Sequence, residues 1–496
     1  MVGWTERDHG DDAPLVAVLV RSQVSRATLR GIDVEEAVAQ PGVVGVFVAA
    51  DIEGARLGVV HGHREVLAVD ELHYVGEPFA VVVARDEPQA WDAAGLVVPD
   101  YDPLDPLVAP VLVEEDDPDV VRIRIQRLAD LGTEPPSPVA TWSGDALRLD
   151  GPGVDDRLDV NELAALVGIE LAQLDVRCDP RTGLIAAAAP LTEVVLAALA
   201  ARQLGEPVRL VVARSEEITS LAHIGDQVVT VRPAIVEGRI AGLEVSIRQD
   251  AGAWPVMGWT DALQAEIAAI GSPYGIASTV RDLEVVQTSS APVACGPAAG
   301  ELFARWITEH VIDEVADRLG VRPVQLRLDH LAGAPELGTR LEQLVAALDT
   351  AISADDALVG VAGSVQKDPD GWGVHVCAVD VSRETGAITI RQLLSDGSDP
   401  RHVASPRGVG PALFEAVLYD EDAQPIGTSL IDYLRPAVSD VPECVLSTDG
   451  SALSTWTPYV VVGAVSDALR SNGVRVPEWT TPLDPVQVLT ALEVLE

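Results

Sequence analysis

Two pairs of neighbouring titratable residues are the first candidates for chemistry. Glu216 and Glu217 are adjacent carboxylates, and Glu309 stands next to His310. Two acids together, or a carboxylate beside an imidazole, can hold and release a proton in general acid–base catalysis. A charged turn or helix surface explains both pairs more simply. We therefore expect solvated side chains at these positions.

Residues that could bind a metal or an anion are few. His61 and His63 can share one face of a strand, but the sequence offers no third ligand nearby, so a polar loop is the simpler interpretation. Arginines can bind phosphate with two parallel hydrogen bonds. Three arginines near the C-terminus could form such a site, although ion pairs with the many carboxylates account for them better. They are Arg401, Arg407 and Arg435.

The cysteines do not form a metal or disulfide pattern. The four stand far apart without a Cys-x-x-Cys pair, so neither a zinc site, an iron–sulfur cluster nor a disulfide framework is encoded. They are Cys178, Cys295, Cys377 and Cys444. We expect reduced, buried thiols.

The composition limits the class of protein. Hydrophobic residues make up 48% and charged residues 22% of the 496 residues, which is a globular composition with room for several domains. The net charge of −43 disfavours nucleic acid and anionic membranes as partners. The most apolar stretch, Leu184 to Ala201, is interrupted by Pro190 and Glu193 and is too short to span a bilayer. We expect a cytoplasmic protein.

The first hundred residues predict a compact α+β domain. Helix signals cover Asp33 to Val38 and Glu87 to Ala94, and strand signals cover Val43 to Val48, Phe79 to Ala84 and Leu96 to Val98. A turn-rich and acidic region then follows. We place this domain at residues 1–115 and a linker at residues 116–137.

The middle of the chain predicts longer elements. A helix covers Leu191 to Leu204, and a strand follows from Val208 to Val212. Two alternating strands, Val228 to Ile235 and Ile240 to Gln249, flank a Glu-Gly turn as a hairpin. A long helix is predicted from Glu301 to Leu319. Together these elements form a second α+β domain over residues 138–335.

The last region, residues 336–496, opens with a stretch of weak signals from Asp355 to Gly371. A hairpin is predicted from Val374 to Val381 and Ala387 to Leu393, and Asp484 begins the terminal helix as its N-cap. The expected fold class of the whole chain is α+β.

Several blocks carry a resemblance to a known family. The runs Pro41 to Phe47, Tyr74 to Ala84 and Asp100 to Leu104 resemble the hammerhead domain of the xanthine dehydrogenase/aldehyde oxidase family. Later blocks resemble the family's molybdopterin-binding domains and follow the same order. They are Ala213 to Glu217, Asp226 and Gln227, Ile312 to Glu314, Gly408 to Gly410, and Asp432 with Tyr433. The resemblance implies a hammerhead-like domain followed by truncated molybdopterin-binding-like domains.

The family implies an enzyme that hydroxylates an electrophilic carbon at a molybdenum centre, with a glutamate as base. Glycine-rich loops hold the pterin dinucleotide. In the first of these loops this chain keeps one glycine, Gly183. In the second, Gly300 remains, but Glu301 replaces an arginine and would repel an anionic cofactor. Gly408 and Gly410 belong to a third region.

Two further departures concern the same function. Between about Gly360 and Val374 the family carries a long segment with a Gly-Gln-Gly loop that is absent here. Alignment of the last helix places Ser451 at the catalytic glutamate, and a serine of ordinary pKa cannot serve as that base. A two-residue gap would place Cys295 at the metal-binding cysteine of carbon monoxide dehydrogenases, but a buried or loop thiol is the simpler interpretation.

These departures predict a relative without cofactor or metal, in which no residue is assigned to catalysis or cofactor binding. We expect a structural or assembly paralogue, in effect a pseudoenzyme, that forms a homodimer or a hetero-complex with molybdenum hydroxylase subunits. One alternative is a working oxidoreductase subunit with molybdopterin cytosine dinucleotide, completed by another chain. The other is a small-ligand binding module that uses the vacated cleft.

Overall fold

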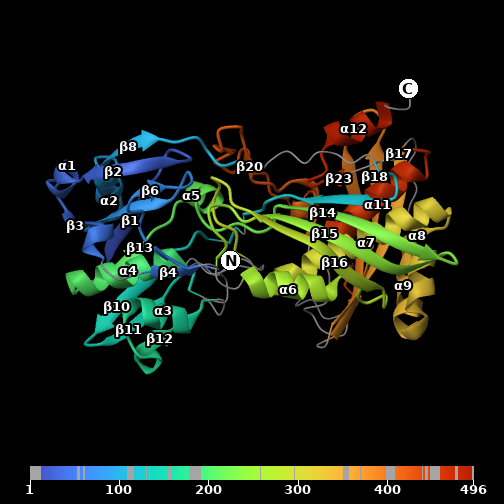
Figure 1. Ribbon diagram of the computed structural model, residues 1–496, viewed down its shortest axis with the longest axis horizontal. Helices are drawn as coiled ribbons and strands as arrows, with labels where there is room; N and C mark the ends of the chain where they lie inside the picture. The colour runs from blue at the N-terminus through green and yellow to red at the C-terminus, as the bar shows by residue number, and fades with distance from the viewer. Residues whose placement is uncertain are drawn as a thin grey trace.

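The computed structural model describes most of the chain. The described residues are 13–52, 56–59, 62–108, 117–129, 131–132, 134–154, 158–177, 191–256, 259–294, 297–349, 357–368, 371–397, 408–437, 439–441, 445–446, 458–474 and 479–493. They form a mixed α+β architecture in which three large sheets follow one another along the long axis of the molecule (Figure 1).

A seven-stranded sheet forms one end of the molecule. Its order is β12 (Leu174–Val176), β11 (Ala146–Asp150), β10 (Val139–Ser143), β13 (Val208–Leu210), β1 (Leu15–Arg21), β7 (Pro78–Ala84) and β3 (Val43–Val48). Strand β1 is apolar from Leu15 to Val20 because both of its faces are covered. Ala17 and Leu19 belong to the core beneath α4 (Leu191–Leu204), and Val16 and Val18 belong to the core beneath α2 (Glu87–Ala94).

This sheet joins the first two predicted domains. Strand β1 pairs in parallel with β13, with Leu15 opposite Val208, and antiparallel with β7. The predicted helices α2 and α4 and the predicted strand β3 are confirmed with the same bounds. The other elements of this end are α1 (Glu35–Val38), α3 (Val160–Val167), β4 (Arg56–Val59), β5 (Gly62–Glu65), and the 3-10 helices Ala49–Asp51 and Leu171–Gln173.

One predicted strand of the hammerhead-like part lies elsewhere. Instead of Leu96 to Val98, the strand β8 covers Val98–Pro103 and pairs with β2 (Ala27–Asp33), which also pairs with β6 (Glu71–Leu72). The segment Asp100 to Pro103, which we interpreted as turn-rich, is therefore part of a strand. Its side chains are mostly exposed, so the alternation of a half-buried strand is missing from the sequence.

The middle sheet corrects the predicted linker. Its order is β16 (Ala277–Val286), β15 (Arg239–Asp250), β14 (Gln227–Val236), β9 (Val121–Ile125) and β23 (Trp479–Thr480). Strand β9 lies inside the proposed linker 116–137, and it pairs with both β14 and β23. The predicted hairpin β14–β15 is confirmed, and Glu237 and Gly238 at its turn both have positive φ, 51° and 76°.

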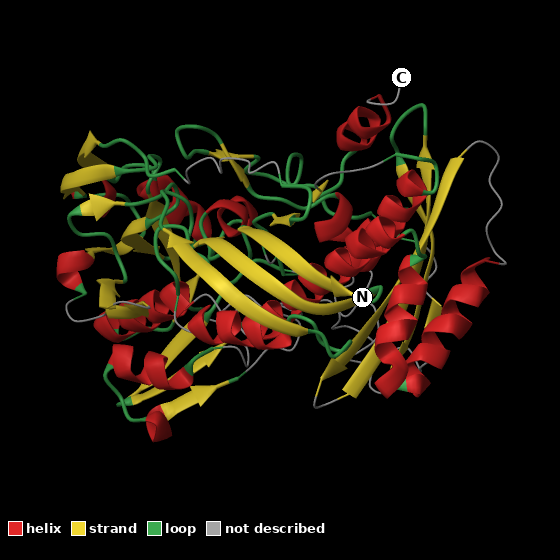
Figure 2. Ribbon diagram, turned by 45° about the vertical axis from the view of Figure 1, so that its right-hand side comes forward, coloured by secondary structure: helices red, strands yellow, loops and turns green. Residues whose placement is uncertain are grey.

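The third sheet contains β17 (Ala357–Asp368), β18 (Gly371–Ser382), β19 (Ile388–Gly397) and β22 (Val445–Leu446). The stretch of weak signals is thus mostly strand β17. Helices α11 (Pro458–Arg470) and α9 (Pro335–Asp349) pack on β17 and β18 (Figure 2). A Cβ on Gly360 would lie 2.0 Å from the Ala464 carbonyl of α11, and one on Gly363 would meet Leu341 of α9. The two helices therefore cover opposite faces of the hairpin.

One large hydrophobic core links the middle and third sheets through α7 (Pro297–Leu319). The remaining elements are α5 (Arg214–Thr219), α6 (Trp259–Ala269), α8 (Pro323–His330), the 3-10 helix Leu331–Gly333, α10 (Val409–Leu413), β20 (Leu418–Tyr419), β21 (Pro425–Ile426) and α12 (Pro485–Glu493). Across the described ranges, no helix has an apolar stretch long enough to cross a bilayer.

Candidate functional site

Several predicted site residues lie outside the described residues. They are Gly183, Ser451, Cys178, Cys295, Cys444, Arg401, Arg407 and His61, together with the side chain of His63. The expectations for these positions stay predictions. Of the other candidates, Cys377 is buried in β18, and Arg435 is exposed.

The retained glycine of the second loop lies where two helices pack. Gly300 is in the first turn of α7, and a Cβ there would lie 1.9 Å from the Ala262 carbonyl oxygen of α6. Its neighbour Glu301 is half-buried, and its carboxylate pairs with the Arg305 guanidinium at 3.0 Å, one turn along the helix. Gly300 thus permits close helix contact, and the charge of Glu301 is compensated within its own helix.

The two glycines of the third region lie at the short helix α10. Gly408 is the residue before the helix, and Gly410 is inside it; both are buried. A Cβ on Gly410 would meet the side chain of Glu415. Helix α10 packs against α11, so these glycines lie beside the helix that follows the Ser451 region.

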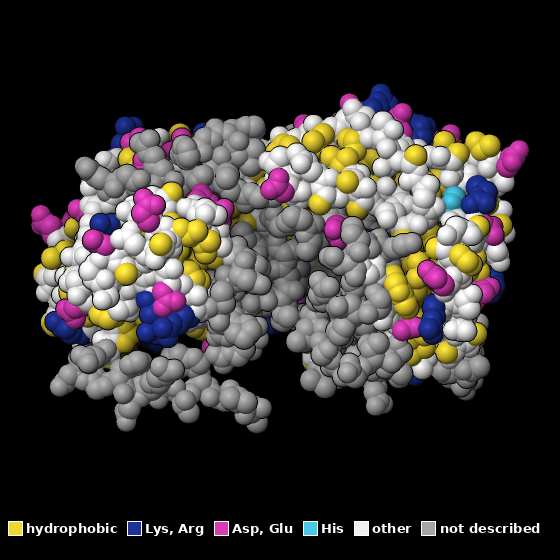
Figure 3. Space-filling model, turned by 90° about the horizontal axis from the view of Figure 1, so that it is seen from below, with side chains coloured by type: hydrophobic (Ala, Val, Ile, Leu, Met, Phe, Trp, Pro, Cys, Tyr) yellow, Lys and Arg dark blue, Asp and Glu magenta, His cyan; other side chains and the backbone are white. Residues whose placement is uncertain are grey.

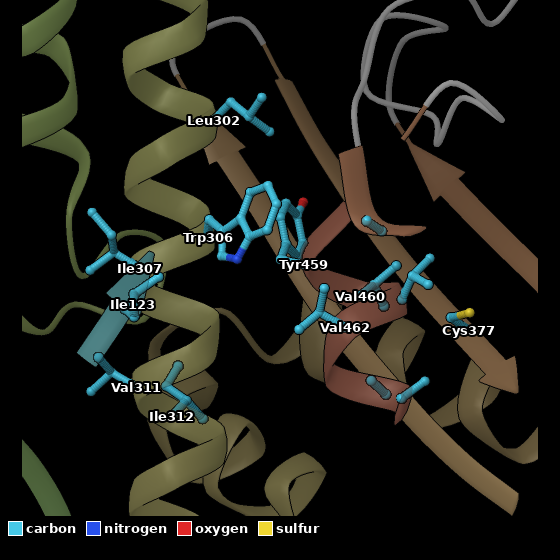
Figure 4. Close-up of a cluster of buried hydrophobic side chains, with 14 of the residues drawn as sticks. Ile123, Leu302, Trp306, Ile307, Val311, Ile312, Cys377, Tyr459, Val460 and Val462 are labelled. Atoms are coloured by element: carbon cyan, nitrogen blue, oxygen red, sulfur yellow. The ribbon is translucent and has the colours of Figure 1, made fainter. Parts of the chain in front are cut away.

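Helices α7 and α11 run in the same direction, and α11 begins beside the middle of α7. Gly463 of α11 lies over Asp313 of α7, and Arg470 of α11 pairs with Glu314 of α7. At the start of α11, Tyr459 points toward Trp306 in the middle of α7 (Figure 4). The start of α11 therefore lies beside the middle of α7, with the short helix α10 packed against α11, and we name this region the helix-start end.

The helix-start end is apolar below its rim. Leu302, Trp306, Val409 and Tyr459 are all buried there. Burial raises the pKa of Tyr459 to about 12, so its phenol stays protonated at physiological pH. The N-terminus of a helix such as α11 carries partial positive charge and can favour an anion. In the described part of this end, the arginine near the rim is Arg305, and it is already paired with Glu301.

The expected solvated pair Glu309–His310 is a correction, because both side chains are buried. Arg327, 1% exposed, donates to Glu309 Oε2 at 2.8 Å and to Asp313 Oδ1 at 2.6 Å. The Tyr274 hydroxyl donates to the other oxygen of Glu309 at 2.8 Å. Burial lowers the pKa of His310, so its imidazole is neutral at physiological pH. These groups hold α7 and α8 to the third sheet.

The expected solvated pair Glu216–Glu217 is also wrong. Glu217 is buried and pairs with Arg214, and Glu216 accepts a hydrogen bond from Arg21 Nε at 2.8 Å. Arg21 also donates to Glu193 at 3.0 Å. Because Arg21 ends β1, this network ties the hammerhead-like strands to α4 and α5. The arginine that pairs with Glu216 is distant in sequence, so the local pattern could not reveal that pairing, whereas Arg214 lies only three residues before Glu217.

Sequence reasoning missed a third arginine network. Arg127, fully buried after β9, pairs with Asp226 at 3.3 Å and Asp250 at 3.2 Å, and donates to the Ala291 carbonyl. His223 is buried nearby, and burial together with the Arg127 charge lowers its pKa to about 3. The positive φ of Asp226, 71°, is an unusual turn that only the folded chain reveals.

A buried acid without a basic partner was also missed. Glu266 of α6 is 1% exposed and accepts one hydrogen bond, from Gln227 Nε2 at 2.9 Å. Within the described residues, its other oxygen and Gln227 Oε1 have no hydrogen-bond partner. Burial raises the pKa of Glu266 to about 8. A protonated Glu266 carboxyl is a hydrogen-bond donor, so protonation can provide one of these two oxygens with a hydrogen bond.

No group of three or more histidine, cysteine or acidic side chains is placed to bind a metal in the part of the chain that the structure describes. Where the underside of the molecule is described, carboxylates and arginines are scattered among apolar side chains without a continuous basic area (Figure 3).

Two family models match the chain in the order of its domains. Residues 7–105 match the aldehyde oxidase and xanthine dehydrogenase a/b hammerhead domain, and residues 161–331 match the molybdopterin cofactor-binding domain. The chain belongs to the xanthine dehydrogenase/aldehyde oxidase family. The resemblance of the sequence blocks is thereby confirmed, and so is the α+β fold class.

Two relatives of this family member are named as subunits of enzymes. The nicotine 6-hydroxylase large subunit of Paenarthrobacter nicotinovorans is 26% identical over 367 residues, which are 64% of this chain and 45% of that protein. The 6-hydroxypseudooxynicotine dehydrogenase complex subunit gamma of the same organism is 26% identical over 468 residues, 77% of this chain and 58% of that protein. The chain spans about half the length of the curated relatives it matches.

Solved structures share the fold of this family member. Quinoline 2-oxidoreductase from Pseudomonas putida 86 matches with a TM-score of 0.76 at 18% identity, over 97% of this chain and 94% of that chain. Aldehyde oxidoreductase from Desulfovibrio gigas matches with a TM-score of 0.79 at 16% identity, over 97% of this chain and 77% of that chain.

Proposed function

We propose that this chain is a non-catalytic structural or assembly paralogue of molybdenum hydroxylase large subunits, without a molybdopterin cofactor of its own. The observation that carries the proposal is the hairpin β17–β18. Its register is continuous from Ala357 opposite Ser382 to Asp368 opposite Gly371. Two residues therefore close the hairpin where the family resemblance implies a long segment with a cofactor-binding Gly-Gln-Gly loop.

The described residues of the helix-start end support the same proposal. Gly300 is occupied by the contact with α6, and the missing Cβ of Gly410 faces a glutamate side chain. Glu301 and Arg305 neutralise each other. A pterin dinucleotide is an anion that requires backbone N–H groups or free cations. These residues do not fit such a group, so we derive no catalytic step through it.

Metal and pterin analysis tests the proposal directly. The full chain is expressed in a host that makes the molybdenum cofactor, together with any neighbouring subunit genes, and is analysed for molybdenum and released pterin. We expect neither above trace level. Molybdenum near one atom per chain would overturn the proposal.

The single variant Ser451→Glu is a second test. It restores the carboxylate at the aligned position of the catalytic base. It reverses none of the other differences from the family. We expect no hydroxylase turnover with purine or aldehyde substrates, for the variant or for the wild type. Turnover by the variant well above the wild-type background would contradict a cofactor-free protein.

A second candidate function is a working oxidoreductase subunit completed by another chain. The observation that favours it is that the chain spans 45% and 58% of the two relatives. A companion gene that encodes the absent Gly-Gln-Gly element supports this candidate. Activity of the co-expressed pair, with molybdopterin cytosine dinucleotide bound, would establish it.

A further inference from the structure

The segment 418–434 exposes a concentration of large apolar side chains. Five of them lie within it: Leu418, Ile426, Leu430, Ile431 and Leu434, which we name the hairpin patch. Ile431 is 84% exposed, and the other four are 45–54% exposed. Large apolar groups concentrated in this way on a surface mark a site of interaction.

The outward direction of the hairpin patch is built into its backbone. Leu418 and Ile426 are cross-strand partners of β20 and β21, so their side chains share one face of the small hairpin. The neighbouring Tyr419 turns to the opposite face, where its hydroxyl accepts a hydrogen bond from Ala291 N at 3.1 Å. Its ring also lies 5.5 Å from the Arg127 guanidinium.

A second tyrosine fixes the other end of the segment. The Tyr433 hydroxyl donates to the Ala129 carbonyl at 2.9 Å and accepts from Ala129 N at 3.2 Å. Tyr433 is 2% exposed, whereas Ile431 and Leu434 beside it are exposed. The patch is thus a surface held in place from beneath, which lowers the entropy cost of binding.

The hammerhead-like part contacts the residues after β16 that anchor Tyr419 from beneath. Leu107, 46% exposed, exchanges two hydrogen bonds with Ser289: its N–H donates to Ser289 Oγ at 3.0 Å, and its carbonyl accepts from Ser289 N at 2.7 Å. Ser289 is two residues from Ala291, which contacts Tyr419. Figure 1 shows β20 at the upper edge of the molecule, between its two halves.

The charges at the rim of the patch indicate what kind of surface fits it. Asp420, Glu421 and Asp422 at the hairpin turn and Asp432 are exposed. Within the described residues none of the four forms an ion pair; Asp420 Oδ1 accepts from the backbone N–H groups of Asp422 and Gln424. The one basic residue between positions 408 and 441 is Arg435.

We propose that the hairpin patch is the docking surface for a different protein chain whose contact area is apolar at its centre and carries arginine or lysine at its rim. A second copy of this chain would set the same carboxylates against one another in a symmetric interface, which is unfavourable. A basic rim instead neutralises them. The inference rests on the proposed assembly function, and it names the surface through which this protein would bind its partner.

Two designed peptides of about 20 residues test the chemistry of the surface. Both form an amphipathic helix with the same Leu/Ile face; one carries arginine and the other glutamate along the rim. Fluorescence anisotropy measures their binding to the full chain at fixed salt. We expect the arginine peptide to bind at least about tenfold more tightly. Equal affinities, or no binding of the arginine peptide, would overturn the proposal.

Variants locate the binding on the chain. Leu418→Ser with Ile426→Ser removes two apolar contacts and is expected to weaken binding about tenfold. Ile235→Ser with Val236→Ser is the matched control, because these residues are 39% and 57% exposed at the turn of β14 and β15. The control should bind as the wild type does. An equal loss in both variants would show that the patch is not the site.

A charge variant tests the rim. Asp420→Asn, Glu421→Gln and Asp422→Asn together remove three negative charges, while an asparagine oxygen at position 420 still accepts the two turn hydrogen bonds. We expect the preference for the arginine peptide to fall to within about twofold. An unchanged preference would contradict the role of these carboxylates.

The outcomes separate this inference from the proposed function. Absence of molybdenum with no peptide preference would leave the cofactor-free paralogue and remove the docking surface. Molybdenum at full occupancy with the expected peptide results would remove the cofactor-free paralogue and leave the docking surface. A homodimer that dissociates in the Leu418→Ser/Ile426→Ser variant, measured by sedimentation equilibrium, would replace the different partner with a second copy and overturn the proposal.

Discussion

At the scale of single residues, Glu266 has the most consequential environment. It is a buried carboxyl with one hydrogen bond from Gln227, and in the described part of the chain no arginine pairs with it. Burial raises its pKa to about 8, against the smaller opposite effect of that hydrogen bond. The folded protein therefore holds a proton at Glu266 that the unfolded chain releases above about pH 4.3.

Glu266 should make stability depend on pH. Because the folded-state pKa is above the unfolded one, its contribution is fully present below about pH 4 and is lost as pH rises to about 8. We expect Glu266→Gln to lack this loss, so that the wild type loses about 2 kcal/mol more than the variant between pH 6 and pH 8.5. Urea denaturation at both pH values measures the difference. Parallel losses in the two proteins would contradict the neutral acid.

Gly300 should be required for packing. In Gly300→Ala the new methyl group would collide with the Ala262 backbone, which cannot rotate away, so α6 and α7 must separate. We expect a loss of about 2 kcal/mol or more in the free energy of unfolding. Gly333→Ala is the control, since nothing lies within 4 Å of its Cβ position. An effect no larger than that of the control would mean that Gly300 does not set the helix contact.

Burial of charge was the property least visible in the sequence. Glu309 and Asp313 both pair with Arg327, which comes from the next helix, α8. A carboxylate on a helix is normally solvated, and only the fold brings the arginine to it. The Glu266 site was missed because only the fold shows that this carboxyl is buried. The sequence identified Gly300 and Gly410 as candidates, but it could not show which residues they pack against.

At the scale of elements, the open edge of β1 predicts how the first domain behaves alone. A fragment of residues 1–115 lacks β13 and leaves the apolar strand β1 without its parallel partner. We expect this fragment to aggregate or to unfold at much lower urea than a fragment of residues 1–212, which contains β13. Light scattering and urea denaturation compare the two. Equal stability and solubility would favour an independent first domain.

Elements with strong periodicity or clear caps were predicted well. Helix α4 ends before Gly205, whose φ is 68°, and Asp86 caps α2 through a hydrogen bond to Gln89 N. Strands whose side chains follow no alternation were missed. Strand β8 is acidic and exposed, and β17 contains glycines at positions 360 and 363 that the packing of α11 and α9 requires. The packing of neighbouring elements, more than their own sequence, determines where these strands form.

At the scale of the whole molecule, the net charge of −43 predicts a response to salt. Like charges spread over the surface repel one another more in the compact state than in the unfolded chain. Raising sodium chloride from 20 mM to 500 mM should therefore raise the apparent Tm by a few degrees. Choline chloride should give the same rise, because screening depends on ionic strength. A falling Tm would mean that exposed ion pairs outweigh the repulsion.

The pairing of β1 with β13 also determines when the protein can finish folding as it is synthesised. Leu15 leaves the ribosome 193 residues before Val208, which at ~5–20 residues per second is roughly 10–40 s. During that interval β1, β7 and β3 can pair, but one edge stays open. The middle sheet waits longer still, since β9 obtains its second neighbour only when Trp479 emerges. The nascent chain therefore carries unpaired apolar strand edges through most of its translation. Such edges are the surface that a holding chaperone would bind.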